Sequence, residues 1–111
     1  MKLSQETQQQ VEQLQVLEQS LQSTVAQKQN FQSQLLEIEN ALAEVQKSKE
    51  QVYRMVGSLM IVASAADVKK DLESRKEVLS LRLDNLTKQE KKLKERFESL
   101  HKEVMKHLQP E

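Results

Sequence analysis

The sequence predicts a mainly α fold, in which two long helices form an antiparallel coiled-coil hairpin and a short β-hairpin joins them. Three observations predict it. In each half of the chain, apolar residues recur at alternating steps of four and three, which is the spacing of a coiled-coil seam. A stretch without charge, residues 55–66, interrupts a sequence in which 31% of residues are charged. That stretch lies near the middle of the 111 residues, where a chain that folds back must turn.

The composition favours helices and leaves room for one domain. Gln, Glu, Lys and Leu dominate, whereas the chain has one Gly, one Pro, two Phe, one Tyr and no Trp. This composition is typical of long helices, and the sustained periodicity argues against disorder. We therefore expect a single domain over 1–111, with a first helix over about 4–50, a β-hairpin over about 52–62 and a second helix over about 65–108.

Each predicted helix has one apolar seam. The first seam runs from Leu3 to Val52 in a single frame, and ten of its fifteen positions are apolar. The second runs from Leu72 to His107, and eight of its eleven positions are apolar. Both patterns keep a period of 3.5 residues, so each helix needs a partner helix along its length.

Capping signals mark the helix ends. Ser4 is a predicted N-cap, with the acidic Glu6 in the following turn. Ser64 is the second predicted N-cap, because Asp67 follows three residues later as in a capping box. Pro110 predicts the end of the second helix.

The partner helix is predicted to come from the same chain. Folding back at the middle pairs positions whose numbers sum to about 118, so that Leu35 meets Leu83. The same register places Lys28, a charge in the first seam, opposite Glu90, a charge in the second. This coincidence favours an intramolecular antiparallel hairpin over a parallel dimer and predicts Lys28 and Glu90 as a register pair.

The turn itself is predicted to be a β-hairpin. Gly57-Ser58 suits a two-residue turn with glycine first, so strands 53–56 and 59–62 would pair 56 with 59, 55 with 60 and 53 with 62. Both faces would be largely apolar, and a lone two-stranded sheet is marginal in water. We therefore predict that the hairpin adds to sheets from other chains. The predicted oligomerisation hairpin comprises Tyr53, Met55, Val56, Gly57, Leu59, Met60, Ile61 and Val62.

Apolar residues also gather off the seams near the chain ends. Val11, Val16 and Val25 lie off the first seam, and Met105 and Leu108 lie off the second. Fold-back would bring most of them together at one tip, where they would form either an adaptable apolar surface or a packing contact between chains. The predicted tip residues are Val11, Leu14, Val16, Leu17, Leu100, Val104, Met105 and Leu108.

No pattern in the sequence predicts catalysis or a cofactor. His101 and His107 lie six apart on different helix faces, and Glu103 with His107 makes only one pair of the kind that a metal site needs. The basic run at 88–96 is interrupted by glutamates, and the two halves of the chain carry net charges of only −3 and +3, so nucleic acid is not an expected partner. The absence of cysteine excludes disulfides and thiolate chemistry and leaves the redox compartment open. Without a signal peptide or a membrane-length apolar run, we expect a soluble intracellular protein, and we expect no enzymatic activity.

Specific motifs resemble the beta-class subunits of the prefoldin family. "VYRMVGSLMIV" (52–62) resembles the hairpin of that class, and "AQKQ" (26–29) and "LTKQEKKLKE" (86–95) resemble its facing coil segments. One hairpin in a short chain fits the beta class, because alpha-class subunits carry two. The loop around "QKSKEQ" (46–51) departs from the pattern, since many relatives carry an acidic insertion there.

The resemblance implies a hexamer of two alpha-type and four beta-type subunits. Their hairpins would form a double β-barrel platform, and the six coiled-coil arms would hold unfolded polypeptides at their tips without ATP. The assembly would deliver these clients to a group II chaperonin in the cytoplasm. Two alternatives from another class remain open: a coiled-coil scaffold, or a filament-forming structural protein, that binds a folded partner.

Overall fold

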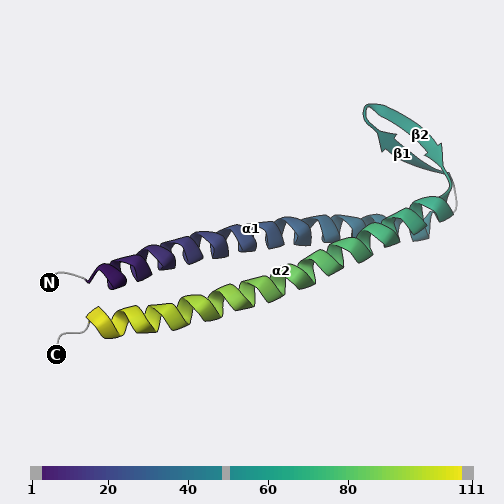
Figure 1. The fold of residues 1–111 in the computed structure, drawn as a ribbon. Helices are drawn as coiled ribbons and strands as arrows, with labels where there is room; N and C mark the ends of the chain where they lie inside the picture. Colours follow the sequence, from purple (N-terminus) through teal and green to yellow (C-terminus); the bar gives the residue numbers. More distant parts are fainter. Residues whose placement is uncertain (1–3, 49–50, 109–111) are drawn as a thin grey trace. The chain divides into compact units, whose positions relative to one another are not determined.

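The computed structural model describes residues 4–48 and 51–108, and it confirms the predicted fold class (Figure 1). Helix α1 spans Gln5–Lys47 and helix α2 spans Ala65–Leu108. Between them, strands β1 (Val52–Val56) and β2 (Leu59–Ala63) pair in an antiparallel β-hairpin.

The helices begin at the predicted caps. The backbone N–H of Thr7 donates to Ser4 Oγ at 3.0 Å, and the N–H of Asp67 donates to Ser64 Oγ at 3.0 Å. Each bond satisfies an amide that a first helical turn would otherwise leave free. Helix α1 ends at Lys47 rather than near 50, and residues 49 and 50 and Pro110 lie outside the described residues.

The chain forms two compact units. The first consists of residues up to Gln29 together with those from Asn85 onward, and it contains both helix ends that flank the chain termini. The second consists of Asn30–Asp84, with the β-hairpin. Both units pair a segment of α1 with a segment of α2, and the expectation that the whole chain is one domain stays a prediction.

The core of each unit is the predicted seam. Every described seam position but one is buried or half-buried. The exception is His107, which is exposed, while Leu108 is half-buried. At the end of α2 the buried face therefore continues from Val104 to Leu108 and not to His107. Burial in the interface stabilises an apolar side chain more than it stabilises an imidazole. The most buried apolar residues are Val104, at 3% exposure, with Leu42, Leu79 and Leu86.

Two threonines share this seam in the first unit. Thr7 and Thr24 are 4% and 3% exposed. Thr24 Oγ1 donates to the carbonyl of Ser20 at 2.9 Å, and Thr7 Oγ1 lies 2.7 Å from Ser4 Oγ, so both hydroxyls have partners. Such bonds let a hydroxyl be buried without a large desolvation cost.

The β-hairpin has the predicted register. Met55 lies opposite Met60, Tyr53 opposite Val62, and Val56 opposite Leu59. Gly57 has φ +63°, and no other described residue has positive φ. Positive φ at the first turn residue alone is the pattern of a type II′ turn, whose twist matches that of paired strands.

Candidate functional site

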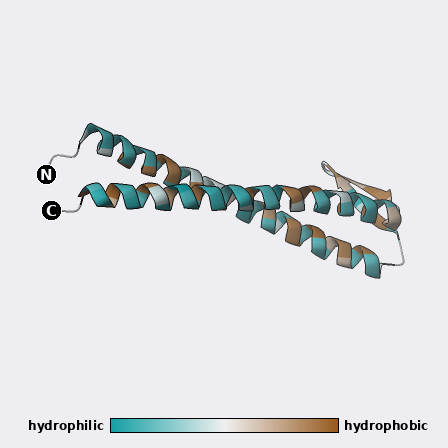
Figure 2. Cartoon of the chain, turned by 60° about the horizontal axis from the view of Figure 1, so that its bottom comes forward, coloured by the Kyte–Doolittle hydropathy of each residue, from teal (hydrophilic) through white to brown (hydrophobic). Residues whose placement is uncertain are grey.

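The hairpin exposes apolar side chains on both faces. One face carries Tyr53, Met55, Met60 and Val62, and the other carries Val56, Leu59 and Ile61. In Figure 2 the hairpin appears mostly in the hydrophobic tones. The exposed fractions are 58% for Tyr53, 62% for Met55, 67% for Met60, 56% for Val62, 52% for Val56, 67% for Leu59 and 47% for Ile61.

The hairpin is a two-stranded sheet, which is marginally stable in water when isolated. The sheet has two strands, so each strand has one edge that is not paired within it. Exposed strand edges and exposed apolar patches both favour association with other chains. This geometry suits the predicted oligomerisation role, which stays a prediction.

An ion-pair chain connects the hairpin to α2 within the second unit. Arg54 Nη2 of β1 lies 3.5 Å from Asp71 Oδ2, and Arg75 Nε lies 3.4 Å from the same oxygen. The three side chains are 42–66% exposed, so each pair contributes at most about 1 kcal/mol. Of the two pairs, Arg54–Asp71 is the one that joins β1 to α2.

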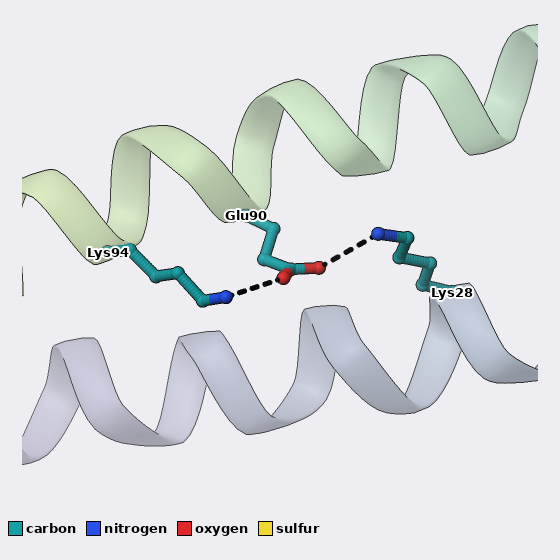
Figure 3. Close-up of polar contacts among 3 residues, drawn as sticks. All are labelled: Lys28, Glu90 and Lys94. Atoms are coloured by element: carbon teal, nitrogen blue, oxygen red, sulfur yellow. Dashed lines mark hydrogen bonds and ion pairs between the residues drawn. The ribbon is translucent and has the colours of Figure 1, made fainter.

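The predicted register residues are in contact in the first unit. Lys28 Nζ lies 3.3 Å from Glu90 Oε2, and the two side chains are 24% and 15% exposed. Glu90 Oε1 also accepts a hydrogen bond from Lys94 Nζ at 3.0 Å, so each carboxylate oxygen faces one ammonium group (Figure 3). Hydrogen bonds from Lys94 and then Lys28 lower the pKa of Glu90 below its ordinary value.

Lys94 was not part of the predicted pair. Its spacing of four residues from Glu90 was the available signal, because a glutamate and a lysine at that spacing are neighbours on a helix. The seam frame alone did not identify it, because position 94 lies outside that frame.

The predicted tip residues lie in the first unit and differ in exposure. Val16 and Met105 are 61% and 44% exposed. Val104, by contrast, is buried at 3% and serves the seam. Only part of this set is therefore available to a partner. The half-buried members are Val11, Leu14, Leu17, Leu100 and Leu108.

An open groove runs over part of these residues. Its volume is about 920 Å³, and Val16, Leu17 and Leu100 supply its apolar part. Acidic and basic side chains surround them, so the groove offers apolar contact beside charges of both signs. The polar and charged residues that line it are Gln9, Glu12, Gln13, Lys92, Glu95, Arg96, Ser99 and Glu103.

Packing near this groove is weakened by a polar seam residue. Gln10 occupies a predicted seam position, and its Oε1 is buried without a hydrogen-bond partner among the described residues. A buried polar atom without a partner costs free energy. The seam in this region is therefore less stable than an all-leucine seam would be.

The second unit holds exposed apolar residues that the sequence analysis missed. Leu36, Val78 and Leu81 are 59%, 48% and 60% exposed. All three are apolar residues at positions off the seams, and that position is the sequence signal of their exposure.

The two histidines singled out in the sequence lie near the C-terminal end of α2. Among residues 4–48 and 51–108, no group of three His, Cys, Asp or Glu side chains could hold a metal ion. His101 stacks on the ring of Phe97, with centroids 5.9 Å apart. Within the same described ranges, no helix combines the length and apolarity that crossing a membrane requires.

Comparisons with known proteins agree on one family. A family model described as "Prefoldin subunit" matches residues 8–111. The prefoldin subunit beta of Archaeoglobus fulgidus is 36% identical over 91% of this chain and 89% of its own length. That of Thermococcus onnurineus is 36% identical over 88% of this chain and 86% of its own length.

A solved structure matches the fold over nearly the full length. The crystal structure of the prefoldin beta subunit from Thermococcus strain KS-1 has a TM-score of 0.91 and 32% sequence identity to this chain. The match covers 99% of this chain and 98% of that one. Fold, sequence and hairpin motif therefore point to the same class of protein.

Proposed function

The chain belongs to the prefoldin family and is a prefoldin chaperone subunit, and from this premise we propose how its two units divide the work. The hairpin joins the chain to alpha-class and further beta-class subunits in a hetero-hexamer. The helix ends of the first unit hold unfolded polypeptides without ATP. The family is one of chaperones and not of known enzymes.

The observation that carries the assembly proposal is the exposure of the hairpin on both faces. Seven large apolar side chains on ten strand residues are 47–67% exposed. Burying such a surface against other hairpins gives roughly 25 cal/mol for each Å² removed from water. Backbone hydrogen bonds along the free strand edges would also align the strands of neighbouring subunits with one another.

The groove in the first unit supports the holding proposal. An unfolded polypeptide exposes short apolar segments flanked by polar residues, and the groove offers the matching arrangement. Each contact would be weak, but several arms in one assembly would act together through effective concentration. Such binding needs no particular client sequence and reverses without ATP.

The remaining partners follow from this role. Clients held in this way would pass to a group II chaperonin in the cytoplasm, and neither nucleic acid nor membrane takes part. The charges of both signs around the groove favour this view over a nucleic-acid surface, which would be uniformly basic.

Aggregation assays on several unrelated denatured proteins test the proposal. The chain is assembled with an alpha-class prefoldin subunit, and light scattering is followed as each protein is diluted from denaturant. We expect complex in molar excess over the client to suppress scattering for all of them, because each complex protects only the client that it holds. Protection of none of them, together with tight binding of one folded protein, would favour a coiled-coil scaffold instead.

A further inference from the structure

The hairpin carries a pair of methionines, Met55 and Met60, whose apolar surface serves the proposed assembly but whose sulfur chemistry it does not use. Met55 and Met60 lie directly opposite each other in the register, with exposed fractions of 62% and 67%. Directly opposed residues of an antiparallel pair share one face, with Cβ atoms about 4.5–5.5 Å apart. Two thioethers therefore lie side by side on an open surface.

Their surroundings are apolar. Tyr53 and Val62 form the next opposed pair on that face and are 58% and 56% exposed. The charged residue of the hairpin, Arg54, lies on the other face and contacts Asp71. Association of this face with another chain would therefore bury both sulfur atoms among apolar groups.

We propose that Met55 and Met60 are an oxidation site through which peroxides block assembly of the free subunit. The inference rests on the proposed function, because it takes the hairpin as the assembly element. A methionine sulfoxide at either position places a polar S=O group in the middle of the same apolar face. Burying that group without a hydrogen-bond partner opposes association.

The chemistry needs only a peroxide as oxidant. A thioether sulfur attacks one oxygen of hydrogen peroxide, the O–O bond breaks and an S–O bond forms. The second oxygen takes up the hydroxyl proton and leaves as water. Sulfur loses two electrons and the peroxide gains them. The two methionine sulfoxide reductase types, one for each sulfoxide epimer, restore the thioether. A dithiol such as dithiothreitol supplies the two electrons and two protons and becomes a disulfide, and the sulfoxide oxygen leaves as water.

Assembly and oxidation compete for the same face. In the free subunit both thioethers are exposed, so a peroxide reaches them. In the assembled complex the apolar face is covered, so oxidation there is slow. Met105 provides an internal reference, because it is 44% exposed and belongs to the first unit, outside the hairpin. The device therefore acts on new subunits and spares complexes that have already formed.

The test uses the full chain and an alpha-class prefoldin subunit, with dilute hydrogen peroxide added before or after the two are mixed. Peptide mass spectrometry measures sulfoxide at Met55, Met60 and Met105, and sedimentation measures the assembled fraction. We expect peroxide added before mixing to oxidise the hairpin pair, to weaken association about tenfold or more and so to lower the assembled fraction. Peroxide added afterwards should oxidise Met105 but leave the pair and the assembly intact.

Two controls assign the loss to these sulfur atoms. Treatment of the oxidised subunit with both reductases should restore assembly, which requires no variant. A Met55→Leu/Met60→Leu double variant, compared with its own untreated sample, should lose no assembly on peroxide treatment. Leucine matches methionine closely in volume and has no sulfur to oxidise.

Several outcomes would overturn the proposal. These are full assembly of a subunit shown to carry sulfoxide at both positions, equal sensitivity of the double variant, and failure of the reductases to restore assembly. The Met60→Lys variant separates this failure from failure of the proposed function. If that charge also leaves assembly unchanged, the hairpin is not the assembly element. If the charge blocks assembly while the sulfoxides do not, only the oxidation proposal fails.

Discussion

The hairpin and the helix-end groove expose apolar surface in different ways. The hairpin is apolar on both faces, with one charged side chain, Arg54, among its ten strand residues. The groove has apolar side chains that are partly used by the seam, and charged side chains of both signs surround them. Among the apolar residues that line the groove, Val16 has more than half of its surface exposed, whereas Leu17 and Leu100 are half-buried.

The difference indicates two kinds of binding. A continuous apolar surface with free strand edges suits a permanent interface, because most of its free energy comes from burial. A mixed surface suits transient contacts, because its charged groups stay hydrated when the site is empty. We expect substitutions in the first region to change assembly and those in the second to change client holding.

The largest effect is predicted for Met60→Lys in the hairpin. A lysine ammonium buried without a partner costs about 3 kcal/mol or more, which corresponds to a loss of more than about a hundredfold in association. Helix content should remain high, because Met60 lies outside both helices. Sedimentation with an alpha-class subunit should show smaller species.

Leu81→Lys is the matched control for that substitution. Leu81 is 60% exposed in α2, close to the 67% of Met60, but lies outside the hairpin. We expect this variant to assemble. Normal sedimentation of the Met60→Lys complex would show that the hairpin has no role in assembly.

A smaller effect is predicted for Val16→Gln in the groove. Losing the valine surface removes about 1 kcal/mol of apolar contact at each arm, which weakens holding about fivefold. Glutamine is the better helix former of the two, so the helix should remain intact. The concentration of complex that halves client aggregation should therefore rise about fivefold. Sedimentation should show that assembly is unchanged.

Leu36→Gln is the control for the groove substitution. Leu36 is 59% exposed on the same helix, yet it does not line the groove. If both variants lose protection equally, client holding depends on general surface apolarity and not on the groove.

The smallest effect is predicted for Glu90→Gln. The pKa of Glu90 is lowered in the folded chain, so its ionised form stabilises the fold at pH values above the unfolded pKa, and this contribution is lost as pH falls through the folded value. The variant should lower the thermal midpoint by a few degrees at neutral pH, measured by circular dichroism.

Acid should remove this difference between the two proteins. The difference should begin to shrink as pH falls below the ordinary glutamate pKa of about 4.3. Wild type and variant should reach the same midpoint only below the lowered folded pKa of Glu90. A gap that stays constant down to acid pH would mean that the carboxylate charge contributes nothing through Lys28 and Lys94.

Much of the fold was predictable because its signals are periodic and local. A seam repeated over many turns determines which helix face is buried, and Gly57 identifies the turn and hence the strand register. The facing charges Lys28 and Glu90 then predict one helix register, and the atoms Lys28 Nζ and Glu90 Oε2 lie 3.3 Å apart.

The functional surfaces were less predictable, because they depend on exposure. Val16 and Val104 are both valines near the chain ends, yet one is 61% exposed and the other 3%. The apolar pattern does not predict the polar lining of the groove. Those side chains come from both helices, and only helix packing brings them together. At the end of α2, the choice of Leu108 over His107 follows from side-chain chemistry and not from the repeat.

The most direct test of this division of labour is a truncation of both chain ends. Removing residues 1–12 and 104–111 takes away Gln9 and Glu12 of the groove lining and four predicted tip residues, while the hairpin in the second unit stays complete. Those four tip residues are Val11, Val104, Met105 and Leu108. Assembly with an alpha-class subunit and suppression of client aggregation are then measured on the same sample. We predict an assembled oligomer that no longer protects denatured proteins. An assembled oligomer that protects them as well as the full-length complex does would contradict the account, because client holding would then not depend on the helix ends.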